Sequence, residues 1–142
     1  MLSLTCKAAI KAVIYLGAKA DEEKCSIKEV AAYINENEHT VGKLLQKLVK
    51  ANVINSSKGP TGGFYVNQAQ KKQPILNIVE AIDGEEVFAM CGLGLSKCNE
   101  KHPCPLHNEY KKIREAFKNL CKQKKVSDLQ NKYSAKTAFL KV

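Results

Sequence analysis

The stretch that decides the fold is SIKEVAAYINENEHTVGKLLQKLVK, residues 26–50. It begins with Ser26 and has Glu29 three residues later, the spacing of a helix-capping box, and apolar residues then recur at helical intervals. Polar residues 35–37 predict a turn, and a second helix with its own apolar stripe follows at once. Two short helices joined by a tight polar turn are typical of a helix-turn-helix.

The second helix of this pair is predicted to have a basic, solvent-facing side. Residues 39–79 contain six lysines and no aspartate or glutamate, whereas most protein surfaces mix both signs. A surface of one sign over this length indicates a partner made of phosphates. The candidate DNA contacts on the helix are His39, Thr40, Lys43, Lys47 and Lys50. We expect the first three to face base edges in a major groove and the last two to face phosphates.

A two-stranded hairpin is predicted directly after the helix pair. Residues 53–58 fit a strand, GPTGG at 59–63 fits a turn, and 64–66 fit a returning strand. The glycines allow a sharp turn and a close approach to another surface. In this position the hairpin is expected to act as a wing that contacts the flanking minor groove or the DNA backbone. Its candidate contacts are Lys58, Gly59 and Thr61.

The long final helix, about residues 105–125, carries a narrow apolar seam. Its apolar residues alternate in steps of four and three, which is the spacing of a seam that packs against a partner helix. The seam consists of Leu106, Tyr110, Ile113, Phe117 and Leu120. We expect self-association along it, since the flanking residues are basic and leave one face to bury. The flanking residues are Lys111, Lys112, Arg114, Lys118 and Lys122.

The predicted fold class is mainly α with a small β-hairpin. A winged helix-turn-helix occupies residues 1–84 and ends with a short helix at 75–82. A cysteine-rich loop follows at 85–104, and a dimerisation helix with a C-terminal tail occupies 105–142.

Length and composition restrict the possible functions. With 142 residues, 44% of them apolar, the chain is expected to form one ordinary domain or a small domain with an appendage, and no apolar run approaches the roughly 18 residues of a membrane span. A domain of this size does not need disulfides, so the six cysteines favour reduced thiols in the cytoplasm. No catalytic constellation or phosphate-binding loop is present in the sequence, which predicts a protein that is not an enzyme.

The order of these parts resembles the Rrf2 family of bacterial winged-helix regulators, which includes IscR, NsrR and CymR. The resemblance covers residues 2–135, and it is most specific in the hairpin KGPTGGFYV, the helix IVEAIDG and the three-cysteine loop that ends in CPLH. It implies a homodimeric transcription factor that binds a palindromic operator in double-stranded DNA. Several members carry an iron-sulfur cluster that controls DNA binding, while others sense thiol or metabolic state without one. Thr40, Lys58 and Thr61 replace the family's usual residues, so the resemblance does not imply the operator sequence.

The cysteine-rich segment CGLGLSKCNEKHPCPLH, residues 91–107, predicts a metal site. Ligating thiolates need a loop in which several sulfur atoms can converge, and the glycines and prolines provide one. The candidate ligands are Cys91, Cys98, Cys104 and His107, and the last occupies the position of the histidine ligand in histidine-ligated family members. An iron-sulfur cluster, 2Fe-2S or 4Fe-4S, is the favoured occupant because the gaps of six and five residues between the cysteines are wide.

Two other uses of the loop stay open. Zinc is often bound by three cysteines and one histidine, although the usual closely spaced cysteine pairs are missing here. The thiols could also act without metal, by oxidation to sulfenic acid or a disulfide. We expect Cys6, Cys25 and Cys121 to be buried as small apolar residues, with Cys6 as an alternative ligand, and His102 to lie on the surface.

These features together predict a homodimeric DNA-binding transcriptional regulator. It would sense redox state, nitric oxide or iron-sulfur status through a cluster on the cysteine loop. One alternative is a cluster-free regulator that senses thiols or recruits a protein partner. Another is an iron-sulfur electron-transfer protein whose basic surface docks an acidic redox partner.

Overall fold

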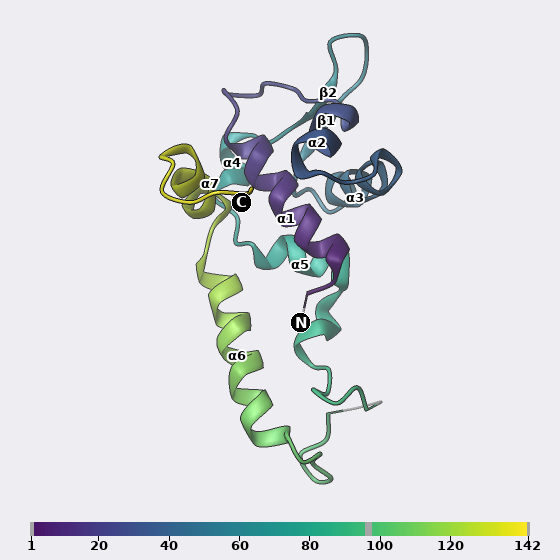
Figure 1. Cartoon of the computed structure of the whole chain (residues 1–142), viewed down its shortest axis with the longest axis vertical. Helices are drawn as coiled ribbons and strands as arrows, with labels where there is room; N and C mark the ends of the chain where they lie inside the picture. Colours follow the sequence, from purple (N-terminus) through teal and green to yellow (C-terminus); the bar gives the residue numbers. More distant parts are fainter. Residues whose placement is uncertain (1, 96–97, 142) are drawn as a thin grey trace.

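The structure, a computed structural model, describes residues 2–95 and 98–141. Its helices are α1 (Leu4–Gly17), α2 (Ile27–Ile34), α3 (Glu38–Lys50), α4 (Gln68–Lys71), α5 (Leu76–Asp83), the 3-10 helix η1 (Glu85–Phe88), α6 (His107–Gln123) and α7 (Val126–Ser134). Its strands are β1 (Asn55–Ser57) and β2 (Gly63–Tyr65). Figure 1 shows a head that contains α1 to α5, the hairpin and α7, and an arm formed by α6 and the loop before it.

The predicted helix-turn-helix is present, and local hydrogen bonds fix its turn. The hydroxyl of Ser26 accepts a hydrogen bond from the backbone N–H of Glu29 at 3.1 Å and so caps α2. Asn35 ends that helix in the left-handed conformation, with φ of 57°. The side chain of Asn37 caps α3 by accepting from the N–H of His39 at 2.8 Å. These caps hold α3 at a defined angle to α2 within a turn of a few residues.

The predicted hairpin is also present, with strands shorter than expected. β1 and β2 pair antiparallel, with Ser56 opposite Phe64. Val53 and Ile54 were expected to belong to the first strand, but they are buried in the core of the head. Cys25, just before α2, exchanges two backbone hydrogen bonds with Phe64, at 2.9 and 2.8 Å. The hairpin is therefore tied directly to the start of the helix pair.

The core of the head is built around α1. This helix packs against α2, α3, α5 and α7, and its buried side includes Val13 and Leu16. The apolar stripe of α3 completes the core with Leu44, Leu45 and Leu48, each at most 1% exposed. The short helices α4 and η1 were not predicted from the sequence.

The arm leaves the head where α6 and α7 meet. The joint is held by backbone hydrogen bonds from Ile75 to Lys124 at 2.8 Å and from Val126 to Gln73 at 2.9 Å. The chain then turns back, and α7 packs on α1. Within the described ranges, no helix has both the length and the apolar character needed to span a membrane.

Candidate functional site

The first candidate site is the outer face of α3. The four basic side chains proposed as DNA contacts on this helix are exposed, and Thr40 is half-buried. The opposite side of the helix is anchored in the core through Leu44 and Leu48. Figure 1 shows the hairpin at the top of the head, α3 on the side of the head, and the cysteine loop at the far end of the arm. The candidate DNA contacts of the helix and of the hairpin therefore both lie in the head, away from the cysteine loop.

The tip of the hairpin extends this surface. Lys58, Gly59 and Thr61 are all exposed. The tip closes with a hydrogen bond from the Gly62 N–H to the Gly59 carbonyl at 3.0 Å. At Gly63 the backbone has φ of 151°, and a Cβ there would lie 2.6 Å from the carbonyl oxygen of Cys25. Only glycine fits where the returning strand meets the segment before α2.

The lysines of this surface are free to meet an external anion. In residues 2–95 and 98–141 the two ion pairs are Lys71 with Asp21 and Lys111 with Glu100, and neither involves α3 or the hairpin tip. Between α2 and α3 an open hollow is lined by Ile27, Glu38, His39, Gly42, Lys43 and Gln46. The structure thus adds Gln46, an exposed amide suited to hydrogen-bonding base edges, to the predicted residues.

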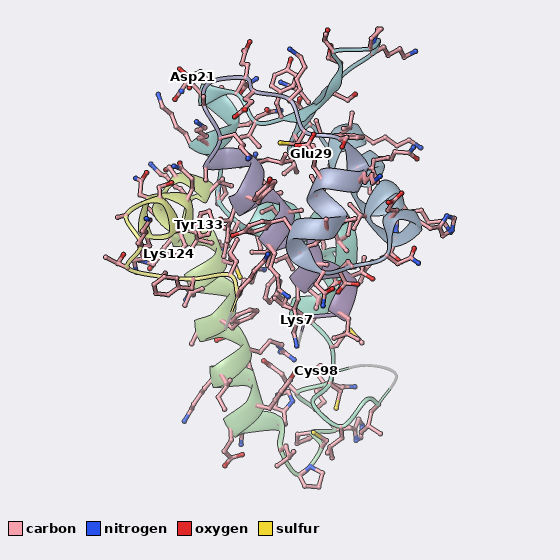
Figure 2. All side chains as sticks on the ribbon, turned by 45° about the horizontal axis from the view of Figure 1, so that its top comes forward. Lys7, Asp21, Glu29, Cys98, Lys124 and Tyr133 are labelled. Carbon is pink, nitrogen blue, oxygen red and sulfur yellow. The ribbon has the colours of Figure 1, made fainter. Side chains whose placement is uncertain are left out.

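The second candidate site is the cysteine loop, which brings the four predicted ligands together as two pairs. The sulfur atoms of Cys91 and Cys104 lie 3.6 Å apart. The sulfur of Cys98 lies 3.3 Å from Nδ1 of His107, the first residue of α6. Figure 2 shows Cys98 in the loop at the end of the molecule away from the hairpin.

These distances fit donors that share a metal atom in pairs. Two thiolates on one tetrahedral ion with metal–sulfur bonds of 2.3 Å are about 3.8 Å apart, and a thiolate and an imidazole are about 3.6 Å apart. Over the described part of the chain, however, no three His, Cys, Asp or Glu side chains surround a single point closely enough to bind one ion. The arrangement therefore fits a centre with more than one metal atom better than a single zinc ion, which needs all four donors on one point.

Backbone and burial give the thiols of the first pair different acidities. Hydrogen bonds from the backbone N–H groups of Leu93 and Leu95 lower the pKa of Cys91, and the first of these spans 3.4 Å to the sulfur. Burial raises the pKa of Cys104, and the neighbouring thiols Cys91 and Cys98 add to the rise. Cys91 is therefore the thiol of this pair that more readily becomes a thiolate.

Two residues of α6 at this site lie differently from the sequence prediction. Arg114 was expected on a solvated flank of the long helix, but it is buried, 6% exposed, with Nη1 2.7 Å from the carbonyl oxygen of Met90. Tyr110, expected in the apolar seam, packs against the loop instead. A Cβ on Gly92 would lie 2.7 Å from its ring, so the loop backbone approaches Tyr110 as closely as only glycine permits.

The other three cysteines are buried, as predicted. Cys6, Cys25 and Cys121 are at most 1% exposed. Burial and the nearby carboxylate of Asp83 raise the pKa of Cys6 to about 12, which opposes the thiolate form that a metal ligand requires. The structure therefore does not favour Cys6 as an alternative ligand. His102 is exposed on the loop, as expected.

The apolar seam of α6 is divided between two roles. Phe117 turns toward the head and packs on Phe88, with ring centroids 5.9 Å apart. Leu106, Ile113 and Leu120, which are seven residues apart, remain about half exposed at 46%, 59% and 46%. A single copy of the chain thus leaves one apolar stripe of α6 uncovered.

Comparisons with known proteins agree with the fold. The Rrf2 family profile, described as iron-dependent transcriptional regulator, matches residues 2–132. The HTH-type transcriptional regulator NsrR of Geobacillus kaustophilus is 27% identical over 141 residues, which cover 94% of this chain and 91% of that protein.

Solved structures show the same fold at lower identity. CymR, the global cysteine regulator of B. subtilis, has a TM-score of 0.76 and 21% identity, covering 92% of this chain and 96% of that one. T. potens IscR has a TM-score of 0.69 and 16% identity, covering 97% and 92%. The solved structures confirm the predicted fold class, and the family profile and the NsrR relative confirm the prediction of a regulator rather than an enzyme. The chain belongs to the Rrf2 family of transcriptional regulators.

Proposed function

We propose that this regulator is a homodimer that binds a palindromic DNA operator and senses the cell's redox state, nitric oxide or iron-sulfur supply through a cluster on its cysteine loop. The observation that supports this proposal best is the placement of the basic face of α3 and the hairpin tip in the head, with the paired cysteines at the far end of the arm. Because the regulator acts where the DNA is, we place it in the cytoplasm.

In the DNA-bound state, α3 lies in the major groove. His39, Thr40 and Lys43 face base edges near the start of the helix, as recognition helices do. Lys47 and Lys50 contact phosphates farther along, and Lys58, Gly59 and Thr61 at the hairpin tip contact the flanking minor groove or backbone. The two copies of α3 in a dimer read half-sites separated by roughly 34 Å, one turn of DNA.

The uncovered stripe of α6 supports the dimer. Leu106, Ile113 and Leu120 lie seven residues apart, so two α6 helices can pack along their length as in a coiled coil. Burying this stripe against a second copy removes three half-exposed apolar side chains from water.

The two donor pairs support an iron-sulfur cluster, with a 2Fe-2S centre as the best fit. Cys91 and Cys104 would hold one iron, and Cys98 and His107 the other. When bound, such a centre supplies one-electron redox chemistry, and the histidine raises its potential relative to an all-cysteine site. The three cysteines lie in a segment without regular secondary structure, His107 begins α6, and both Cys91 and His107 are buried from water.

The cysteine loop connects the DNA-binding head to the helix that carries the dimer stripe. The loop follows α5, which packs on α1 and α3 in the head, and leads into α6, which carries the dimer stripe. Ordering of the loop by a ligand thus sets the pose of α6 relative to the head. Because the two heads read half-sites of fixed spacing, a ligand that favours one pose changes operator affinity.

A metal-free thiol switch is the second candidate, and the Cys91–Cys104 contact favours it. Their sulfurs are 3.6 Å apart, and the pKa of Cys91 is lowered by backbone hydrogen bonds. A peroxide would oxidise the Cys91 thiolate to a sulfenic acid, which Cys104 attacks to form a disulfide with release of water.

One experiment separates these functions. The protein is purified without oxygen, its visible spectrum is recorded, and iron and sulfide are counted. A coloured protein with two irons and two sulfides per chain, lost in C98A and kept in the matched variant C25A, fits the cluster. A colourless protein that forms a Cys91–Cys104 disulfide with peroxide fits the thiol switch. DNA binding is tested on duplexes selected from a random pool, and failure to enrich a palindrome would contradict the regulator mechanism.

A further inference from the structure

Arg114 belongs to α6 and is covered by the cysteine loop, on the same face of the helix as His107. The two residues are 6% and 7% exposed, and residues two helical turns apart share one face. Both approach the sulfur of Cys98, with Nη1 of Arg114 at 3.5 Å and Nδ1 of His107 at 3.3 Å. The helix thus presents two nitrogen groups to one sulfur.

No carboxylate pairs with this guanidinium in the described residues. Glu100, the carboxylate of the same loop, pairs with Lys111 instead. The Nε–H of Arg114 is buried and has no hydrogen-bond partner. Arginine stays charged at every pH at which proteins fold, and a buried charge with an unused donor is costly. The unused donor points to an acceptor that the polypeptide does not supply.

We propose that Arg114 is a positioning residue for the cysteine-loop centre. Its free Nε–H donates to a sulfur acceptor of the anionic group held by the two donor pairs, and its positive charge offsets the charge of that group. This inference rests on the proposed iron-sulfur function. Thiolates and sulfides are anionic, and both the net charge and the hydrogen bonds to sulfur set the reduction potential of such centres. A fixed cation beside the centre favours its reduced, more negative state.

The hydrogen bond to Met90 offers a simpler role, that of a strut which fixes the start of the loop. The two roles differ between the loaded and the empty protein. A strut stabilises both forms equally. A charge offset stabilises the loaded form only, because in the empty form the guanidinium is a buried charge with an unused donor.

Three variants separate the roles. R114Q removes the charge but keeps an amide donor, and R114K keeps the charge but loses the Nε–H. K112Q, at an exposed lysine on the same helix, is the matched control for the loss of one charge. The protein is loaded without oxygen, and the midpoint potential is measured by dye titration. The rate at which a chelator bleaches the visible band and the thermal midpoints of the empty and the loaded protein complete the measurements.

We expect R114Q to have a more negative midpoint potential and to bleach several-fold faster, with an unchanged or higher thermal midpoint when empty. R114K keeps the charge without the Nε–H and should have a potential between those of R114Q and the wild type, and K112Q matches the wild type in every measurement. If the R114Q variant binds the cluster and has the wild-type potential and bleaching rate, the role assigned to Arg114 is wrong, while the proposal of a cluster is unaffected. An equal loss of thermal midpoint in the empty and loaded forms overturns it in favour of the strut.

Failure of the proposed cluster gives a different result from failure of the Arg114 assignment alone. A wild-type protein that stays colourless after reconstitution with iron and sulfide rejects the cluster itself, and the assignment of Arg114 falls with it. If R114Q does not fold, R114M removes the same charge with an unbranched apolar side chain. The same expected shift in potential then decides the assignment.

Discussion

The hydroxyls of Tyr33 in α2 and Tyr133 in α7 share a hydrogen bond, although 100 residues separate them in the chain. Tyr33 also stacks on Tyr15 of α1, with ring centroids 4.1 Å apart. Figure 2 shows Tyr133 where α7 meets the helices of the head. Burial and Tyr33 raise the pKa of Tyr133 to about 12, so the phenol stays protonated and able to donate. The C-terminal helix thus braces the first helix of the helix-turn-helix.

Removing one hydroxyl of this pair should destabilise the head. Y133F deletes the hydrogen bond and leaves the Tyr33 hydroxyl half-buried without its partner. We expect a loss of about 1 kcal/mol in the free energy of unfolding. Urea unfolding measures it as a lower midpoint with an unchanged slope. Y65F, on the hairpin, removes a hydroxyl outside the cluster, and an equal loss in that variant would contradict the bracing role.

The buried side of α3 should dominate the stability of the DNA-binding head. Leu48 is 0% exposed and lies in the core between the helices. L48A leaves a cavity there, and we expect it to lower the free energy of unfolding by about 2–5 kcal/mol. Q46A, at an exposed position of the same helix, should change it by less than about 0.5 kcal/mol. Similar losses in both variants would show that α3 is not anchored as described.

The basic outer side of α3 should control the salt dependence of DNA binding. K47Q removes a proposed phosphate contact from each copy of the dimer. The slope of log affinity against log salt concentration should fall by about 0.9 per phosphate contact, or about 1.8 per dimer. Fluorescence anisotropy across a salt series measures the slope. K122Q removes an exposed lysine of α6 and should leave the slope unchanged; a change as large as that of K47Q would place the DNA elsewhere.

Burial of Cys6 makes stability fall at alkaline pH. Its folded-state pKa is raised from 9.0 to about 12, first by burial and then by Asp83. Above pH 9 the unfolded chain loses this proton while the folded chain keeps it, so stability falls with rising pH, by at most about 1.4 kcal/mol per pH unit. Urea midpoints between pH 8 and 10 measure the fall. The apolar variant C6V should show a smaller slope, and an unchanged slope would mean that Cys6 is not the titrating group.

The helix-turn-helix was predictable because its signals are local. The capping serine Ser26 and the left-handed Asn35, with φ of 57°, act within a few residues of the chain. The apolar periodicity of α3 needed no knowledge of its neighbours. The helix α4 spans only Gln68–Lys71, too short to show a period, and for that reason it was missed.

The cysteine loop was only partly predictable because its contacts are not periodic. The four predicted ligands do meet, but sequence spacing could not show that Cys91 pairs with Cys104 and Cys98 with His107. Arg114 was missed for a related reason. A charged residue on a helix flank is nearly always solvated, and only the path of the loop across α6 buries this one.

The exposed stripe of α6 yields the sharpest prediction for assembly. Ile113 is 59% exposed in the single chain, so I113K should leave the fold of a monomer intact. In a dimer the new lysine would face the same lysine of the second copy across the seam. Each copy would lose about 2 kcal/mol of apolar burial, and the dimer dissociation constant should therefore rise roughly a thousandfold. Sedimentation velocity measures the shift to monomer, and circular dichroism verifies that helix content is kept. N119K adds the same charge at an exposed polar position of α6 and should remain dimeric. If I113K also stays dimeric, the two copies associate through some other surface, and the half-site spacing expected from α6 no longer follows.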